Sequence, residues 1–170
     1  MERTGIVTIH KNPLTLVGPA LSPGDRAPDF TALANDMSPK SLADFSGKVL
    51  VLAAVPSLDT PVCEVETKRF NREAASLGPD VALVTVSMDL PFAQKRFCAA
   101  EGITALTTLS DHRDADFGLK YGVLIKELRL LARSVFVADR AGILRYVEIV
   151  PETSQEPDYE KALAAVKALL

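Results

Sequence analysis

Unbroken apolar runs alternate with amphipathic stretches along the middle of this chain. Val49–Val55 and Val81–Met88 are largely apolar and predict central strands of a sheet that is covered on both faces. Each run is followed by a predicted helix, the first over Glu64–Leu77 and the second over Pro91–Glu101. Gly78-Pro79 is a strong stop signal for the first helix, and a proline suits the first turn of the second. The pattern predicts two successive strand–helix units.

The remaining predicted elements are short and are separated by turn residues. They are an N-terminal hairpin of Ile6–His10 and Leu14–Val17, a strand over Ala105–Leu109, a helix over Asp111–Tyr121, a hairpin of Ser134–Ala138 and Ile143–Val150, and a last helix capped by Pro157-Asp158. The order strand, helix, strand, helix, hairpin, helix predicts an α/β fold in which helices flank a mixed central sheet. The length of 170 residues predicts a single domain over residues 1–170.

Composition and charge argue against several classes of protein. The net charge is −3, from 19 basic and 22 acidic residues, and no more than two basic residues adjoin, so the chain has no electrostatic footprint for nucleic acid. No apolar run is long enough to span a bilayer, and Met1–Gly5 lacks the features of a signal peptide. We therefore expect a cytoplasmic protein with no nucleic-acid or membrane partner. His10 and His112 lie at no ligand spacing from a cysteine, so we expect no metal and no other cofactor.

Cys63 is the first candidate for chemistry. It follows the Val49–Val55 strand and comes directly before the predicted Glu64–Leu77 helix. The N-terminus of a helix carries unpaired N–H groups and the positive end of the helix dipole, which favour a thiolate over a thiol. Thr60 can place a hydroxyl beside that sulfur, although it also suits a simple turn. The alternative for Cys63 is a small buried residue at a strand–helix junction, since free cysteines are often buried.

Cys98, the other of the two cysteines, lies near the end of the Pro91–Glu101 helix. The apolar side of that helix is marked by four residues, Phe92, Ala93, Phe97 and Ala100. Gln94 and Glu101 share the side of Cys98 instead. This position predicts an accessible thiol on a polar or boundary face. Structural disulfides are rare in the cytoplasm, so two cysteines there are more often catalytic, redox-sensing or simply free.

The segments around both cysteines resemble the peroxiredoxins. Pro56, Thr60 and Cys63 form the pattern Pro-x-x-x-Thr-x-x-Cys of the peroxiredoxin active site. The run Asp89–Cys98 is similar to that of the thiol peroxidase subfamily, the atypical two-cysteine peroxiredoxins. Three further stretches agree with this subfamily: Gly24–Phe30, Ala132–Phe136 and Glu156–Leu163. The resemblance spans nearly the whole chain, and it implies a thioredoxin-like fold with an added N-terminal β-hairpin.

The resemblance also implies an activity, the reduction of hydrogen peroxide and organic hydroperoxides in antioxidant defence. It makes Cys63 the peroxidatic residue, which becomes a sulfenic acid, and Cys98 the resolving residue, which closes an intramolecular disulfide. Arg133 matches the arginine that contacts sulfur and peroxide, although an arginine beside an apolar run is otherwise a solvated strand end. Pro56 has a supporting role in limiting access of water. Thioredoxin is the implied reductant.

We expect the attack on peroxide and the closure of the disulfide to need two different geometries. A disulfide requires Cα atoms within roughly 7 Å, whereas a reactive Cys63 must lie with Thr60 and Arg133. We therefore predict that the first turn after Cys63, or the helix that carries Cys98, unwinds locally during the cycle.

The leucine-rich segment Gly122–Ala132 allows more than one interpretation. It suits a core-packed loop or a short extra helix, and it also suits a surface for self-association. The resemblance implies a homodimer with residues near the active site at its interface.

Two other functions stay open at this point. A general disulfide oxidoreductase normally carries Cys-x-x-Cys, but Cys63 is followed by Glu-Val-Glu. A non-catalytic thioredoxin-fold binding or chaperone module would not require Thr60, Cys63 and Arg133 to lie together.

Overall fold

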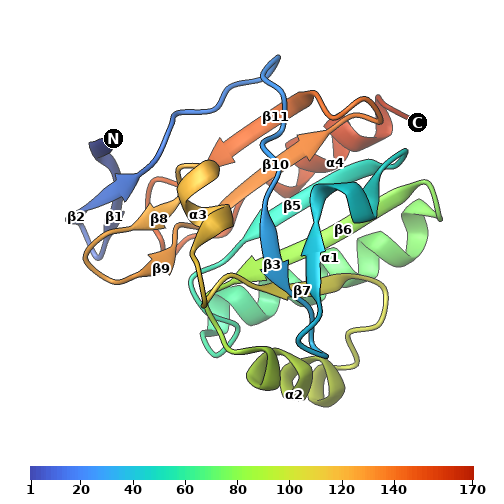
Figure 1. Cartoon of the computed structure of the whole chain (residues 1–170), viewed down its shortest axis with the longest axis horizontal. Coiled ribbons are helices and arrows are strands. Elements are labelled where there is room, and N and C mark those ends of the chain that lie inside the picture. Colours follow the sequence, from blue (N-terminus) through green and yellow to red (C-terminus); the bar gives the residue numbers. More distant parts are fainter.

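The fold is built on a seven-stranded mixed sheet with the order β11-β10-β5-β6-β7-β3-β4. The computed structural model describes all residues from Met1 to Leu170. The strands of this sheet are β3 (Thr31–Leu33), β4 (Pro39–Ser41), β5 (Val49–Ala54), β6 (Val81–Ser87), β7 (Thr107–Ser110), β10 (Ser134–Ala138) and β11 (Leu144–Ile149). Strands β5, β6 and β7 run parallel, while β10 pairs antiparallel with β5 and with β11. The predicted mixed sheet is confirmed (Figure 1).

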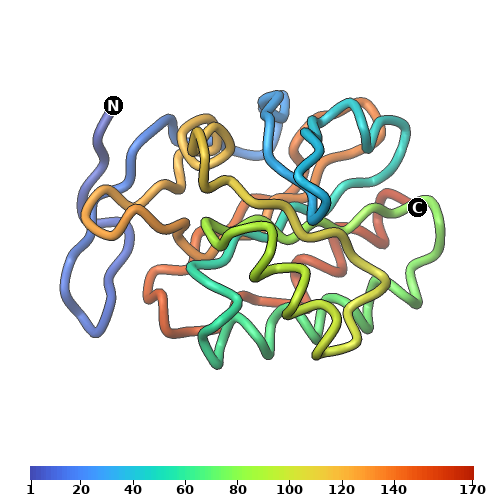
Figure 2. The backbone as a smooth tube through the Cα atoms, turned by 60° about the horizontal axis from the view of Figure 1, so that its bottom comes forward, coloured from blue at the N-terminus to red at the C-terminus, as the bar shows by residue number.

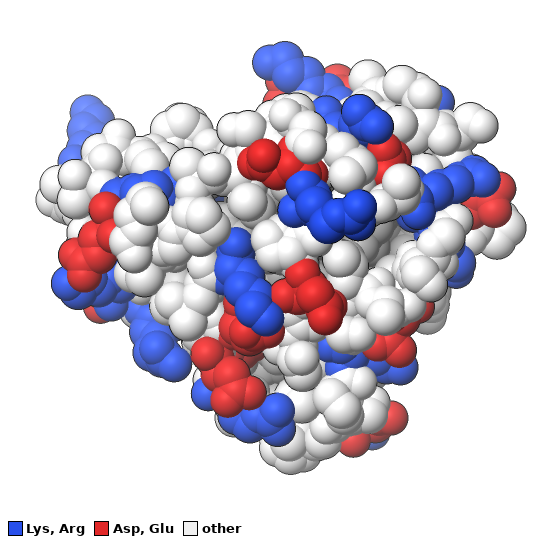
Figure 3. All heavy atoms as spheres, turned by 45° about the horizontal axis from the view of Figure 1, so that its top comes forward, with Lys and Arg blue, Asp and Glu red and all other residues white.

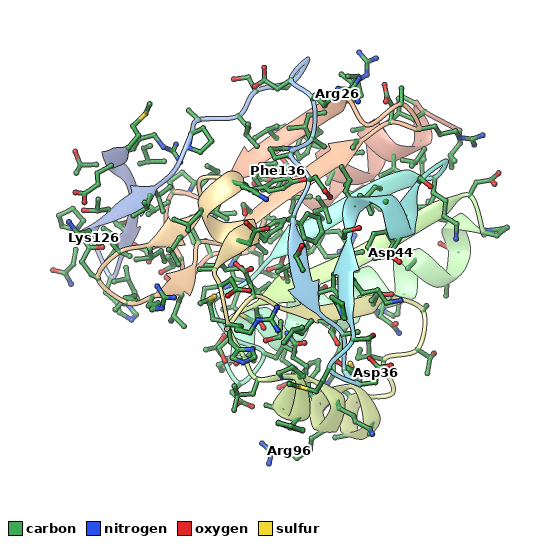
Figure 4. All side chains as sticks on the ribbon, in the orientation of Figure 1. Arg26, Asp36, Asp44, Arg96, Lys126 and Phe136 are labelled. Carbon is green, nitrogen blue, oxygen red and sulfur yellow. The ribbon has the colours of Figure 1, made fainter.

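Helices cover the two faces of this sheet unequally. On one face lie α1 (Pro61–Leu77), α2 (Pro91–Glu101) and α4 (Tyr159–Lys167); on the other lies the short α3 (Asp116–Lys120). Alternate residues of β5 point to the two faces, since Val51 belongs to the hydrophobic cluster with α1 and α4 and Leu52 belongs to the cluster with α3. A short 3₁₀ helix, η1 (Leu42–Phe45), precedes β5. Phe136 lies at the centre of the α3 side (Figure 4).

A second, four-stranded sheet has the order β1-β2-β8-β9 and extends from one end of the molecule. Its strands are β1 (Glu2–Ile9), β2 (Asn12–Val17), β8 (Leu124–Ile125) and β9 (Leu130–Leu131). In Figure 2 the blue N-terminal hairpin projects beside the orange β8–β9 segment. The predicted N-terminal hairpin is therefore confirmed, and β8 extends it by pairing with β2.

The Gly122–Ala132 segment contains no helix. It forms the β8–β9 hairpin, and most of its apolar side chains are buried, which leaves Leu128 exposed at 42%. A helix is prevented because β2 offers its edge to residues 124 and 125. Gly122 adopts φ +68°, and a Cβ there would lie 1.9 Å from the carbonyl oxygen of Pro19. A glycine at this position is thus required for the chain to turn into β8.

Two predicted helix boundaries were wrong. α1 begins at Pro61, not at Glu64, because Thr60 takes extended N-cap dihedrals and Pro61 fits the first helical position. The helix predicted over Asp111–Tyr121 is shorter and begins later, as α3. The Asp111 carboxylate accepts hydrogen bonds from the Phe117 and Gly118 N–H groups and so caps the helix at its later start. None of the helices combines the length and the apolar character needed to cross a bilayer.

Candidate active site

Cys63 is a fully buried thiol in the first turn of α1. The sequence predicted that Cys63 lies just before the helix. Since α1 starts at Pro61, Cys63 lies inside the helix instead. It packs with Val55, Leu58 and the edge residue Phe97. The N–H groups of this first turn have no carbonyl partner within the helix, and the positive end of the helix dipole lies here. Reactive cysteines are often found at such a helix N-terminus.

Arg133 contacts the Cys63 sulfur, as predicted. The residue directly precedes β10, which lies next to β5 in the sheet, so the topology brings it beside the end of β5 where Cys63 follows. Its Nη2 donates to Cys63 Sγ at 3.2 Å. Arg133 is 1% exposed, so water screens this contact little. The alternative of a solvated strand end is wrong for Arg133.

Two further groups hold the Arg133 side chain. Its Nη1 forms a buried ion pair with Glu66 Oε2. The carbonyl oxygen of Thr153 accepts from Nη2 at 3.0 Å and from Nε at 3.3 Å. The planar guanidinium therefore has one edge fixed by a carboxylate and another by a backbone oxygen, and Nη2 is aimed at the sulfur.

Sequence reasoning missed both of these groups. Glu66 follows Cys63 by three positions on α1, so the helical spacing that places two residues on one face would have identified it. Thr153 contributes only its backbone carbonyl to Arg133. Every residue type has this group, so the sequence does not indicate the contact.

Glu66 is an acid in an unusual environment. Burial raises its pKa from an ordinary 4.5 to about 7, although the nearby Arg133 charge opposes that rise. Its second oxygen, Oε1, has no hydrogen-bond partner. An unpaired buried carboxylate oxygen is costly, which is consistent with a raised pKa.

Thr60 and Pro56 lie at the entrance to the site rather than on the sulfur. The Thr60 hydroxyl donates to the Ser57 carbonyl at 2.9 Å and forms no hydrogen bond with Cys63. Both residues line a cavity of about 260 Å³ together with Arg133. Its apolar walls come from the second sheet with its β8–β9 turn and from the start of α1; they are formed by Ile9, Ile125, Leu128, Leu130 and Val62. The cavity gives a small, partly apolar molecule a route to Arg133.

Cys98 lies on α2 and is half-buried, beside a different cavity. That cavity measures about 310 Å³ and includes Asn35 and Asp36 from the β3–β4 connection, which lies beside α2 in Figure 4. Cys98 Sγ is 3.5 Å from the Thr108 hydroxyl. Both cysteines are free thiols, and the structure does not bring them into one pocket. Phe97 packs against both hydrophobic clusters in which the two cysteines lie.

The predicted faces of α2 were partly wrong. Gln94 is fully buried, because its amide donates to the Ser87 hydroxyl and to the Leu109 carbonyl, both at 2.9 Å. Phe92 is 67% exposed instead of packing inward, and Arg96 points away from the molecule (Figure 4). The half-buried thiol of Cys98 fits the predicted boundary position, but its neighbour Gln94 faces the sheet.

A further site among the charged side chains would be a cluster of one sign or a group that could bind a metal ion. On the face shown in Figure 3, Lys and Arg side chains are interspersed with Asp and Glu. No three His, Cys, Asp or Glu side chains come together in a group that could hold a metal ion.

Comparisons with known proteins agree on one group. The Redoxin family profile matches residues 22–163. Thiol peroxidases of Oceanobacillus iheyensis and Bacillus subtilis are 58% and 56% identical to this chain, and the matches cover 93% and 96% of it and 96% and 98% of the relatives. The crystal structure of a peroxiredoxin-like protein from Aquifex aeolicus superimposes with a TM-score of 0.91 at 47% identity, over 99% of this chain and 98% of that one.

Removal of the Arg133 charge should make Cys63 less reactive. We expect Arg133→Met to slow alkylation of Cys63 by iodoacetamide by about tenfold, because a charge-assisted hydrogen bond is worth roughly 1.5–3 kcal/mol. In a Cys98→Ser background, Cys63 is the one cysteine that the alkylation follows. In the double variant Glu66→Gln, Arg133→Met, neither partner of the buried ion pair is left as an unpaired charge, so the effect on the thiol is measured without that cause of misfolding. Arg140→Met, at a surface position, is the control. An unchanged alkylation rate in both Arg133 variants would show that Arg133 does not activate the thiol.

Glu66 should make the stability of the fold depend on pH. Since its pKa is raised in the folded state, the folded protein binds this proton more tightly than the unfolded chain. The resulting stabilisation is present at low pH and is lost as pH rises through about 7. Urea unfolding near pH 5 and near pH 8 should show that the wild type loses more free energy of unfolding than Glu66→Gln, by on the order of 1–3 kcal/mol. Equal losses in the two proteins would contradict the raised pKa.

Proposed function

This chain belongs to the Redoxin family, as a thiol peroxidase of the peroxiredoxin group, and from that membership we propose that Cys63 is the residue that reduces peroxide. The observation that carries the proposal is the buried contact of 3.2 Å between Arg133 Nη2 and Cys63 Sγ. A fixed guanidinium favours the thiolate before the reaction and stabilises negative charge on the leaving oxygen during it.

The first step is attack of the Cys63 thiolate on one peroxide oxygen. A sulfur–oxygen bond forms as the oxygen–oxygen bond breaks, and the other oxygen leaves as water or an alcohol after it takes up a proton. Cys63 is then a sulfenic acid, oxidised by two electrons. The cavity lined by Thr60 and Pro56 supports this step, because it leads from the surface to Arg133. Its apolar walls suit organic hydroperoxides as well as hydrogen peroxide.

The second step is resolution by Cys98. Its thiol attacks the sulfenic sulfur, a disulfide forms, and water leaves with the former peroxide oxygen. Cys63 is fully buried and Phe97 packs against the clusters of both cysteines, so this step requires local opening near the start of α1 or in α2. A third step regenerates the two thiols by exchange with the dithiol of thioredoxin. The cycle would serve antioxidant defence in the cytoplasm.

The competing functions have less support. A general disulfide oxidoreductase requires a second cysteine close to Cys63 on the same helix, and α1 offers none. A non-catalytic module gives no reason for a buried arginine to be aimed at a buried thiol.

A peroxidase assay with variants of the two cysteines tests the proposed cycle. With thioredoxin, its reductase and NADPH present, the wild type should consume peroxide continuously. Cys63→Ser should abolish consumption, because a hydroxyl is far less nucleophilic than a thiolate. Cys98→Ser should consume peroxide only until its Cys63 is oxidised and should then stop without a disulfide, as read by intact-protein mass. Turnover that survives in Cys63→Ser would remove the central proposal.

We also propose that the protein forms a homodimer near this cavity. Leu128, at the β8–β9 turn, is exposed beside the cavity entrance, and burial of such a side chain favours association. Sedimentation at micromolar concentration should show a dimer that Leu128→Glu weakens, with Leu170→Glu, at the exposed C-terminus, as the control. A wild-type monomer at that concentration would contradict the dimer.

A further inference from the structure

The Asp89 carboxylate joins the two segments that carry the cysteines. Asp89 lies in the turn between β6 and α2. Its Oδ1 accepts a hydrogen bond from the Ser57 hydroxyl at 2.7 Å, and its Oδ2 accepts from the Leu58 N–H at 2.8 Å. Ser57 and Leu58 belong to the loop that leads from β5 to Cys63. No other side chain from outside this loop forms a hydrogen bond with residues 56–60.

The same carboxylate is tied to the helix of Cys98. The Ser87 hydroxyl donates to Asp89 Oδ2 at 2.7 Å, and that hydroxyl accepts from the Gln94 amide of α2 at 2.9 Å. The Ser110 hydroxyl of β7 donates to the Asp89 carbonyl at 2.5 Å. A continuous chain of hydrogen bonds therefore runs from the Cys63 loop through Asp89 and Ser87 to α2.

Apart from the packing of Leu58 against Val55 and Cys63, the loop has few other contacts that fix it. The remaining side-chain hydrogen bonds of residues 56–60 are internal, from the Thr60 hydroxyl to the Ser57 carbonyl and from the Asp59 N–H to the Ser57 hydroxyl. Both involve Ser57, the residue that Asp89 holds. Loss of the Asp89 contacts therefore removes the side-chain hydrogen bonds that tie this turn to the rest of the molecule.

We propose that Asp89 is a positioning residue that holds the Cys63 loop in its peroxide-reactive arrangement and so sets the balance between reaction with peroxide and closure of the disulfide. It acts through Ser57 and Leu58 and touches none of the reacting atoms. The inference rests on the proposed function, because it presupposes a disulfide between Cys63 and Cys98.

The Cys63 sulfenic acid can undergo two competing reactions, and the ratio of their products measures the balance between the closed and the open arrangement. In one, the Cys98 thiol attacks the sulfenic sulfur, a disulfide forms and water leaves; this requires the loop or α2 to open. In the other, a second peroxide transfers an oxygen to the sulfenic sulfur, which becomes a sulfinic acid, and the peroxide is reduced to an alcohol or water. This second reaction requires the closed arrangement. Weakening the Asp89 contacts should therefore speed disulfide closure and suppress sulfinic acid.

The test compares Asp89→Asn and Ser57→Ala with the wild type in single turnovers. Reduced protein is mixed with cumene hydroperoxide and quenched rapidly, and the sulfenic, sulfinic and disulfide forms are separated by intact-protein mass. Each variant should form the sulfenic acid more slowly and close the disulfide about fivefold faster, as expected for loss of one hydrogen bond in the closed state. The ratio of sulfinic acid to disulfide should fall by a similar factor. Asp59→Asn, which removes an exposed charge from the same loop, should match the wild type.

A double variant separates positioning from general destabilisation. If Ser57 and Asp89 act through one contact, the effects of the two substitutions on the ratio should not add. A merely structural role would lower the thermal midpoint and leave the ratio unchanged, and that result overturns the inference. If Asp89→Asn does not fold, Ser57→Ala alone decides by the same ratio.

The two proposals fail differently. If wild-type protein with peroxide yields no Cys63–Cys98 disulfide, the proposed cycle fails whatever Asp89 does. If the wild type closes the disulfide but both variants keep its rates and its sulfinic-to-disulfide ratio, the role of Asp89 is wrong and the cycle stands.

Discussion

A buried guanidinium governs the arrangement of the whole site. Arg133 cannot lose its charge under any ordinary condition, so the fold must surround it with acceptors or leave an uncompensated charge in the interior, at a cost of several kcal/mol. Glu66 and the Thr153 carbonyl supply two of those acceptors, and the Cys63 sulfur supplies the third. The Cys63 sulfur is therefore one of the groups that surround a buried charge, which links the arrangement of the core to the chemistry of the thiol.

The central sheet explains why these groups meet. Strand β5 is buried along its whole length, and its apolar run alone predicts a central strand. Pairing with β10 brings residue 133 to the end of β5, where the chain turns into α1 and Cys63. The sequence was enough to predict β5, β6, α2, the β10–β11 hairpin and the α4 cap, because each has a long apolar period or a strong boundary residue. The family motif, rather than periodicity, singled out Arg133.

Features that depend on distant partners could not be predicted in this way. Strands β3 and β4 are three residues each, too short for a period to show, and β8 forms only because β2 offers it an edge. Gln94 looks like a surface residue until its two buried acceptors are in place. The same holds for the Thr153 carbonyl that accepts from Arg133, since a backbone carbonyl belongs to every residue type. Local signals thus predict elements, whereas the contacts that complete the site arise between elements.

The proposed cycle requires a fixed geometry for the attack on peroxide and an opening for the disulfide. Different hydrogen bonds of the site serve these two requirements. Contacts to Arg133 are buried and charge-assisted, which suits a geometry that must be reproduced for every peroxide. The contacts of Asp89 lie in half-buried turns, where an exchange with water costs less. Opening through the Asp89 turn therefore leaves Arg133 paired with Glu66, while opening through Arg133 would strand a buried charge. In the proposed cycle, the route by which Cys63 reaches Cys98 at lower cost is therefore the one that moves the loop and keeps the guanidinium in place.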